Sequence, residues 1–172
     1  MTNQLNLNYI RELLDYDPNT GYLTNKVKGI RRAIGKRVGG NTCNPEAYRS
    51  IRIDGILYLE HRLVWYHYYG TWPTSIIDHI NRNKSDNRIS NLREVTYSQN
   101  AINKLPNNCL YRGVTLSSSG TKFKSQIRLN NILVYIGTFN SAKEASLAYE
   151  SRAREHHKEF YINPNYTYNE NI

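Results

Sequence analysis

The sequence has only two cysteines in 172 residues, Cys43 and Cys109, and no C-x-x-C pair. Two isolated cysteines cannot form a four-ligand zinc cage or the disulfide framework of a small secreted domain. A single disulfide between them is left open. No apolar run approaches the roughly 20 residues that a membrane-spanning helix needs, and the Met-Thr-Asn-Gln start has no features of a signal peptide. We therefore expect a cytoplasmic protein without structural zinc and without a membrane partner.

Acidic residues are missing from two long tracts. No Asp or Glu occurs between Asp17 and Glu46 or between Glu94 and Glu144, although Lys and Arg recur in both tracts and the formal net charge is +9. Such a distribution favours a polyanion as partner, and the alternative is a basic surface that only keeps the protein soluble. The first tract predicts a surface loop that contacts phosphate, through Lys26, Lys28, Arg31 and Arg32.

The most informative stretch covers residues 77–103 and reads IDHINRNKSDNRISNLREVTYSQNAIN. β-Branched residues flank Asp78 and His79, which predicts a short strand that presents both polar side chains. A loop over 81–90, a second strand over 91–96 and a helix capped by Thr96 are then expected in that order. One acid, one imidazole and several amides thus fall close together, and we interpret the stretch as an active site.

This order of residues resembles the HNH endonucleases, which have the ββα-metal nuclease fold, and within them the branch encoded by phages and introns. The resemblance rests on the blocks His61-Arg62-Leu63-Val64, Asp78-His79-Ile80, Asn87 to Leu92, Val95-Thr96 and Ser98-Gln99-Asn100. The zinc-binding cysteine pairs of that branch are absent. An Asp-His pair alone before an Asn-rich loop is usually a turn with a solvated carboxylate, so the additional blocks are what favour a nuclease.

The resemblance implies a role for each polar residue of the stretch. His79 would take the proton of the attacking water as general base, since its unperturbed pKa is about 6.5. Asp78 and Asn100 would give oxygen ligands to one Mg²⁺ (or Mn²⁺) ion, with waters and phosphate completing its shell. Asn91 would brace the loop and so orient His79, and Asn87 would approach the phosphate or brace the same loop.

The rest of the first half predicts small elements around this stretch. We expect a helix over 5–14, a turn over 17–21, a strand from Tyr22, a hairpin over 48–59 with Asp54-Gly55 as its turn, and a helix over 61–69 that ends at Gly70. Its expected packing residues are Leu63, Val64, Trp65 and Tyr68. We expect His61 to support the active-site strand as a structural residue, not as base or ligand.

Pro106 and its Asn neighbours predict a linker, and the sequence after it has a different pattern. Strands are expected over 111–115, 122–129 and 132–139, followed by a helix whose capping box is Ser141 to Glu144 and whose packed face carries Ala145, Ala148, Tyr149 and Arg152. The side chains of the middle strand are expected to alternate between the two faces of the sheet. Phe123, Ser125, Ile127 and Leu129 fall on one face, and the basic and amide side chains fall on the other.

This module, about residues 108–165, resembles the AP-two type DNA-binding domain of plant ethylene-response factors. The resemblance rests on Tyr111-Arg112-Gly113-Val114, Ile136 to Phe139, Glu144 to Tyr149 and Phe160 to Asn163. It implies a sheet face in the major groove of duplex DNA, with contacts from Arg112, Lys122, Gln126, Arg128 and Tyr135, to which charge alone adds Lys124. Thr115 and Ser117 replace arginines of the plant domains. The alternative is a small α+β appendage for protein contact.

Together these observations predict an α+β protein with an HNH nuclease domain over 1–104, whose ββα-metal core covers about 76–104, and a DNA-binding domain over 105–172. The expected activity is metal-dependent nicking of double-stranded DNA by a free-standing phage homing endonuclease in the host cytoplasm. We expect a monomer, with a dimer left open. The alternative is a DNA-binding regulator whose nuclease core is inert.

Overall fold

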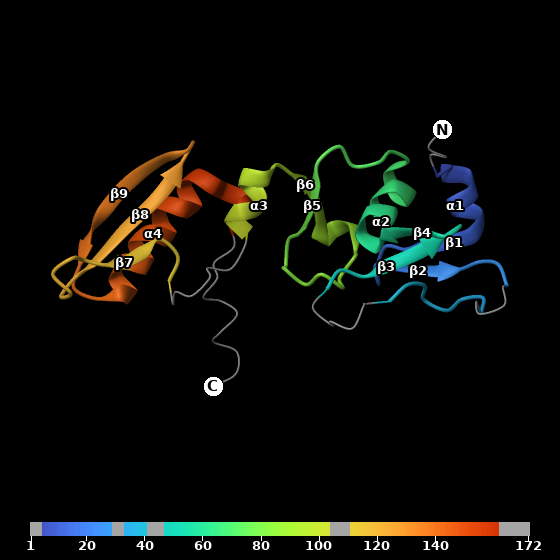
Figure 1. Ribbon diagram of the computed structural model, residues 1–172, viewed down its shortest axis with the longest axis horizontal. Helices are drawn as coiled ribbons and strands as arrows, with labels where there is room; N and C mark the ends of the chain where they lie inside the picture. The colour runs from blue at the N-terminus through green and yellow to red at the C-terminus, as the bar shows by residue number, and fades with distance from the viewer. Residues whose placement is uncertain (1–4, 29–32, 41–46, 104–110, 162–172) are drawn as a thin grey trace. The chain divides into compact units, whose positions relative to one another are not determined.

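The computed structural model describes residues 5–28, 33–40, 47–103 and 111–161. The chain divides into two units, residues 1–97 and residues 98–172. Each unit combines small antiparallel sheets with helices (Figure 1), so the predicted mixed α+β class is confirmed. No helix in the described ranges is long and apolar enough to cross a membrane.

The described residues of the first unit form three two-stranded antiparallel sheets and two α-helices. Its elements are α1 (Leu7–Leu13), β1 (Leu14–Asp17), β2 (Tyr22–Asn25), β3 (Ser50–Ile53), β4 (Ile56–Leu59), α2 (Glu60–Tyr69), β5 (Ile76–His79), the 3-10 turn η1 (Ile89–Asn91) and β6 (Leu92–Val95). The strands pair as β1-β2, β3-β4 and β5-β6. Each hairpin gives apolar side chains to one core, which contains Ile10, Leu14, Leu23, Val38, Ile51, Ile53, Leu63, Val64, Ile77 and Leu92.

Local turn chemistry explains several boundaries of these elements. Asn6 caps α1 by accepting a hydrogen bond from the backbone N–H of Asn8 at 2.8 Å. Asp54 and Gly55 have φ values of +48° and +82°, the left-handed pair that a tight hairpin turn needs. Gly70 ends α2 with a φ of +77°. The predicted hairpin and both predicted helices are therefore confirmed.

Two details of the predicted core differ from the structure. The residues 14–17 form β1, whereas the apolar spacing predicted that the helix continues to Leu14. Tyr68 was predicted as a packing residue of α2 but is 49 % exposed, because Leu63 and Val64 already fill the buried face of this short helix.

The second unit contains a three-stranded antiparallel sheet covered on one face by a helix (Figure 1). Its elements are α3 (Tyr97–Asn103), which begins at the last residue of the first unit, β7 (Val114–Leu116), β8 (Phe123–Leu129), β9 (Ile132–Phe139), α4 (Ala142–His157) and the 3-10 turn η2 (Lys158–Phe160). The sheet order is β7-β8-β9. The predicted linker around Pro106 lies outside the described residues.

Small residues let α4 lie close to the sheet. Ala145 and Ala153 are fully buried and Tyr149 nearly so, with Ser146 beside them, whereas the predicted Ala148 and Arg152 are only half-buried. Ser141 caps the helix by accepting a hydrogen bond from the N–H of Glu144 at 3.1 Å, as predicted. Gly113, with a φ of +70°, has no room for a side chain, because a Cβ there would lie 2.2 Å from the Tyr149 ring.

Candidate active site

The β5-β6 hairpin positions the Asp-His pair. Asp78 lies opposite Arg93, and His79 lies opposite Leu92. Successive strand residues point to opposite faces of the sheet, so the carboxylate and the imidazole leave β5 on different sides. Both side chains are nevertheless buried. Buried polar side chains on a short hairpin need specific partners, and each of the two has at least one among the described residues.

Asn87 is the partner of His79. The imidazole Nε2 lies 2.9 Å from the side-chain oxygen Oδ1 of Asn87. An amide oxygen can only accept, so this contact favours the tautomer with the proton on Nε2 and leaves the lone pair on Nδ1. Burial lowers the pKa of His79, while the hydrogen bond to Asn87 and the charge of Asp78 oppose that shift. The imidazole is therefore held neutral, which is the form that can accept a proton.

Arg93 is the partner of Asp78. Its Nε and Nη2 atoms lie 3.0 and 2.9 Å from the carboxylate oxygen Oδ2. The Arg93 and Asp78 side chains are 13 % and 9 % exposed, so this ion pair is largely removed from water. The cation neutralises the buried carboxylate within the first unit.

Asn91 fixes the loop that follows β5. Its Oδ1 accepts a hydrogen bond from the N–H of Asn81 at 2.9 Å, and its Nδ2 donates to the carbonyl of Asp86 at 2.8 Å. Its own carbonyl accepts from the N–H of Ile80 at 2.9 Å. One amide side chain thus joins both ends of the loop that carries Asn87. Within the described residues, the buried Nδ2 of Asn87 has no hydrogen-bond partner.

The β1-β2 hairpin braces the same loop from 70 residues away, and the sequence analysis missed this contact. The hydroxyl of Tyr16 donates to the carbonyl of Asn87 at 3.1 Å and accepts from the N–H of Ile89 at 2.9 Å. At Gly21, whose φ is +73°, a Cβ would lie 2.3 Å from the backbone nitrogen of Arg88. The turn signal at 17–21 predicted a glycine turn, but nothing in the sequence indicated what would pack on it.

An aromatic cluster surrounds the imidazole of His79. The ring of His61 lies 5.2 Å from that of His79 in an edge-to-face arrangement, and the ring of Tyr48 lies 4.9 Å from His61 and 5.9 Å from His79. Burial, with the nearby His79 and Arg62, lowers the pKa of His61 to about 3. His61 is therefore a neutral packing residue at this site.

Sequence comparison agrees with this geometry. Residues 58–102 match the HNH endonuclease family model. No curated protein and no solved structure matches the chain. The HNH match includes the β5-β6 hairpin and the residues Asp78, His79, Asn87, Asn91 and Asn100. It supports nuclease activity on DNA in general, and HNH nucleases generally use a divalent metal ion.

Asn100, the last residue of the predicted HNH set, is half-buried on α3 and belongs to the second unit. Its pairing with Asp78 stays a prediction. No group of three or more His, Cys, Asp or Glu side chains in the described part of the chain could hold a metal ion. A metal at the HNH site would therefore depend on amide and substrate oxygens beside the Asp78 carboxylate.

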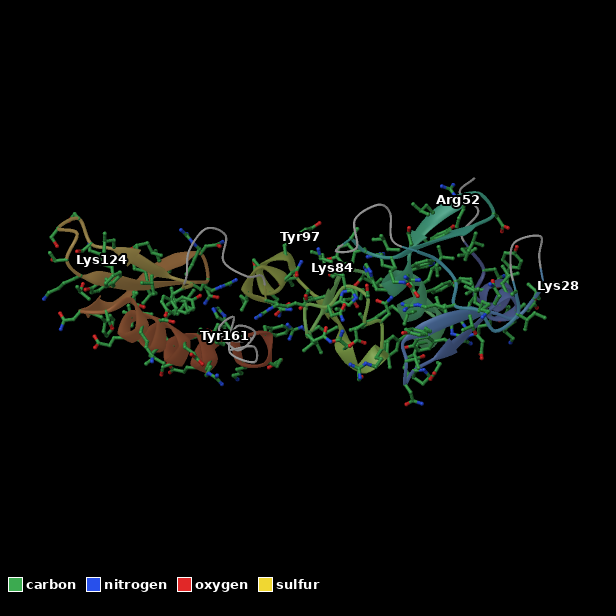
Figure 2. The ribbon with its side chains drawn as sticks, turned by 90° about the horizontal axis from the view of Figure 1, so that it is seen from below. Lys28, Arg52, Lys84, Tyr97, Lys124 and Tyr161 are labelled. Carbon is green, nitrogen blue, oxygen red and sulfur yellow. The ribbon has the colours of Figure 1, made fainter. Side chains whose placement is uncertain are left out.

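The three-stranded sheet, outside the HNH match, brings together most of the predicted DNA-binding residues. In the register of β8 and β9, Lys124 lies opposite Thr138, Gln126 opposite Tyr135 and Arg128 opposite Leu133. Opposed residues share a face, and the inward residues Ser125 and Ile127 are buried under α4. The open face therefore carries Lys124 (Figure 2), Gln126, Arg128 and Tyr135, with Lys122 just before β8.

Arg112 is not part of this open face. Its Nη1 donates to the carbonyls of Ala101 and Ile102 at 3.1 and 3.0 Å, so it satisfies the C-terminal end of α3. Lys26 is also engaged, since its Nζ lies 3.0 Å from the carbonyl of Arg11. Lys28 is exposed, and Arg31 and Arg32 lie outside the described residues.

Proposed function

We propose that the chain is a metal-dependent HNH endonuclease that nicks one strand of duplex DNA, as a free-standing phage homing endonuclease in the host cytoplasm. The observation that carries the proposal is the buried His79, bonded through Nε2 to Asn87 and adjacent to Asp78 within the matched segment. β5, β6 and α3 would be the two strands and the helix of a ββα-metal core.

His79 would act as the general base. With the proton on Nε2, the Nδ1 lone pair is oriented by the bond to Asn87. Nδ1 takes a proton from the water that attacks phosphorus, and the bond from phosphorus to the 3′ oxygen breaks. Asn91 and Tyr16 act as positioning residues, because they hold the loop that carries Asn87.

Asp78 and Asn100 would hold the metal ion. Carboxylate and amide oxygens are the hard donors that Mg²⁺ (or Mn²⁺) prefers, so this donor set fits such an ion. The ion would supply positive charge near the leaving 3′ oxygen. Arg93 holds the Asp78 carboxylate in place for that task through its two hydrogen bonds.

The open face of the second unit would dock on duplex DNA as an AP-two type module. Its basic and amide side chains alternate with buried apolar ones along β8, and the aromatic Tyr135 stands beside Gln126 on the same face. In this proposal residues 1–104 cut and residues 105–172 bind. Because each half reads a different segment of DNA, a monomer can occupy an asymmetric site without the two-fold symmetry of a dimer.

A plasmid assay tests the proposal. With limiting enzyme and Mg²⁺ or Mn²⁺, supercoiled plasmid should yield open circles before linear molecules, EDTA should abolish the reaction, and His79→Ala should slow it by at least roughly 100-fold without loss of DNA binding. His156→Ala, at an exposed position of α4, is the matched control. Binding without cleavage in either metal would favour the regulator with an inert core. Linear product from the start, rising with the square of enzyme concentration, would establish a cooperating pair.

A further inference from the structure

Lys84 is a cation near the active site, and no carboxylate of the described residues forms an ion pair with it. It is exposed in the loop between β5 and η1 (Figure 2), and it has no hydrogen bond or ion pair with the described residues. Four arginines of the first unit differ from Lys84 in that each is paired with a carboxylate. Arg93 is paired with Asp78, Arg88 is paired with Asp86, and Arg37 and Arg49 share the buried Glu60. An external anion can therefore bind Lys84 without breaking an ion pair among the described residues.

The backbone on both sides of Lys84 is fixed by side chains of the loop. Asn81 Oδ1 accepts from the N–H of Asn83 at 2.9 Å, and Asn83 Oδ1 accepts from the N–H of Ser85 at 3.0 Å. Asn81 Nδ2 also donates to the carboxylate of Asp86 at 2.7 Å. Since the loop is already ordered, an anion that binds Lys84 has only the lysine side chain left to immobilise.

Tyr48 joins Lys84 to the imidazole of the proposed base. The Lys84 Nζ lies 5.3 Å from the centroid of the Tyr48 ring, and the same ring packs on His61 and His79. The tyrosine remains 41 % exposed. An exposed aromatic ring beside a lysine provides the two contacts that a nucleotide offers, a stacking surface for the nucleoside and a charge for its phosphate.

We propose that Lys84 and Tyr48 form a nucleotide-positioning pair, in which Lys84 binds a phosphate flanking the scissile bond and Tyr48 packs against the adjoining nucleoside. The proposal rests on the proposed nuclease function. It assigns a DNA contact to the first unit that is independent of the open face of the three-stranded sheet. Because the pair binds substrate and transition state alike, its loss raises KM more than it lowers kcat.

Steady-state cleavage by the full-length protein tests Lys84. Lys84→Ala should raise KM for duplex DNA by roughly 10- to 100-fold, as expected for a lost hydrogen bond to a charged group, with kcat nearly unchanged. The slope of binding against salt should fall by about 0.9. Lys84→Arg should retain most of the affinity, and Lys143→Ala, at an exposed position of α4, should behave as wild type. An unchanged KM and salt slope in Lys84→Ala would overturn the lysine contact.

Photo-crosslinking tests Tyr48 without requiring catalysis. Wild-type protein in EDTA, bound to duplex DNA in which 5-iodouracil replaces thymine throughout, should crosslink at Tyr48. Tyr22 is the matched control, because it is also about as exposed, at 40 %, and has the cation Arg37 over its ring at 3.7 Å, yet that arginine is already paired with Glu60. Crosslinks at Tyr22 or elsewhere, with none at Tyr48, would overturn the stacking contact.

The two experiments separate this proposal from the nuclease proposal. A wild-type protein that cuts no DNA in Mg²⁺ or Mn²⁺ would end the nuclease proposal, and the crosslink in EDTA would still decide whether Tyr48 meets DNA. A wild-type protein that cuts, with neither an effect of Lys84→Ala nor a crosslink at Tyr48, would overturn the positioning pair alone.

Discussion

Arg93 lies directly across the strand pair from Asp78 and donates from both Nε and Nη2 to one carboxylate oxygen, at 3.0 and 2.9 Å. The side chain proposed as metal ligand is thus balanced by a cation of its own hairpin. A shielded pair of this kind, with two charge-assisted hydrogen bonds to one oxygen, holds the carboxylate in a fixed orientation. If Asp78 holds the metal as proposed, the stability of the protein and the binding of metal depend on the same atoms.

Replacing that arginine should reveal the dependence. Arg93→Leu leaves a buried carboxylate without its partner, which typically costs about 3–5 kcal/mol of unfolding free energy. Mn²⁺ should then stabilise the variant more than it stabilises wild type, because the ion replaces the missing charge. Urea unfolding with and without Mn²⁺ measures both effects. Arg154→Leu, which breaks an exposed pair with Glu150, should cost under about 1 kcal/mol and show no metal dependence. Equal stability of Arg93→Leu and wild type would contradict the prediction.

The pH profile of cleavage should report on His79 and Asn87. Burial lowers the pKa of His79, so the imidazole stays neutral at pH values below the ordinary histidine pKa of about 6.5. The acid limb of the kcat/KM profile should therefore lie below about pH 6.5. Asn87→Leu removes the hydrogen bond that raises this pKa, so the limb should move to still lower pH while the rate falls. A limb that moves to higher pH in this variant would show that Asn87 does not act on the imidazole in this way.

His61 should make folding stability depend on pH. Its pKa is about 3 in the folded protein, whereas an unfolded histidine has the ordinary value of 6.5. Between these values the unfolded chain binds the extra proton, so stability is full above about pH 6.5 and falls as pH drops toward 3, by an amount on the order of a few kcal/mol. His61→Phe keeps a ring in place and should remove this part of the slope. Parallel curves of unfolding free energy against pH for wild type and His61→Phe would contradict the prediction.

The open face of the three-stranded sheet should contribute phosphate contacts. Lys124→Ala should weaken binding to all duplexes and reduce the salt slope by about one, and Lys143→Ala on the opposite side of this unit should do neither. Arg128 donates to the carbonyl of Asn131 at 3.0 Å. Arg128→Ala tests whether this side chain also contacts a base edge, because the loss of such a contact would relax sequence specificity. Binding that is unchanged after removal of residues 106–172 would assign this module another task.

Sequence patterns predicted the elements whose causes are local. Asp54-Gly55 specifies its hairpin and Gly70 its helix end through backbone conformation alone, and neighbouring β-branched residues specify β5. The support of the site could not be predicted in this way. Tyr16 and Gly21 meet Asn87 and its neighbour across some 70 residues, a contact that depends on how the hairpins pack.

The same limit applies to charged residues. Arg112 falls within a block that resembles a DNA-binding motif, yet its guanidinium bonds the carbonyls of Ala101 and Ile102. Its proposed contact with DNA remains a prediction. Charge and position in a motif predict what a side chain can bind, and tertiary packing decides which partner lies within reach.

The hydrogen bonds from Arg112 to the end of α3 affect how this chain could be recombined with another DNA-binding module. Arg112 completes the last turn of the helix that bears Asn100, because its guanidinium donates to the carbonyls of Ala101 and Ile102. A chimaera joined at residue 104 would leave two helix carbonyls without their donor. Exchange of the module after residue 104 should therefore succeed when the incoming module brings an arginine of its own to that helix end.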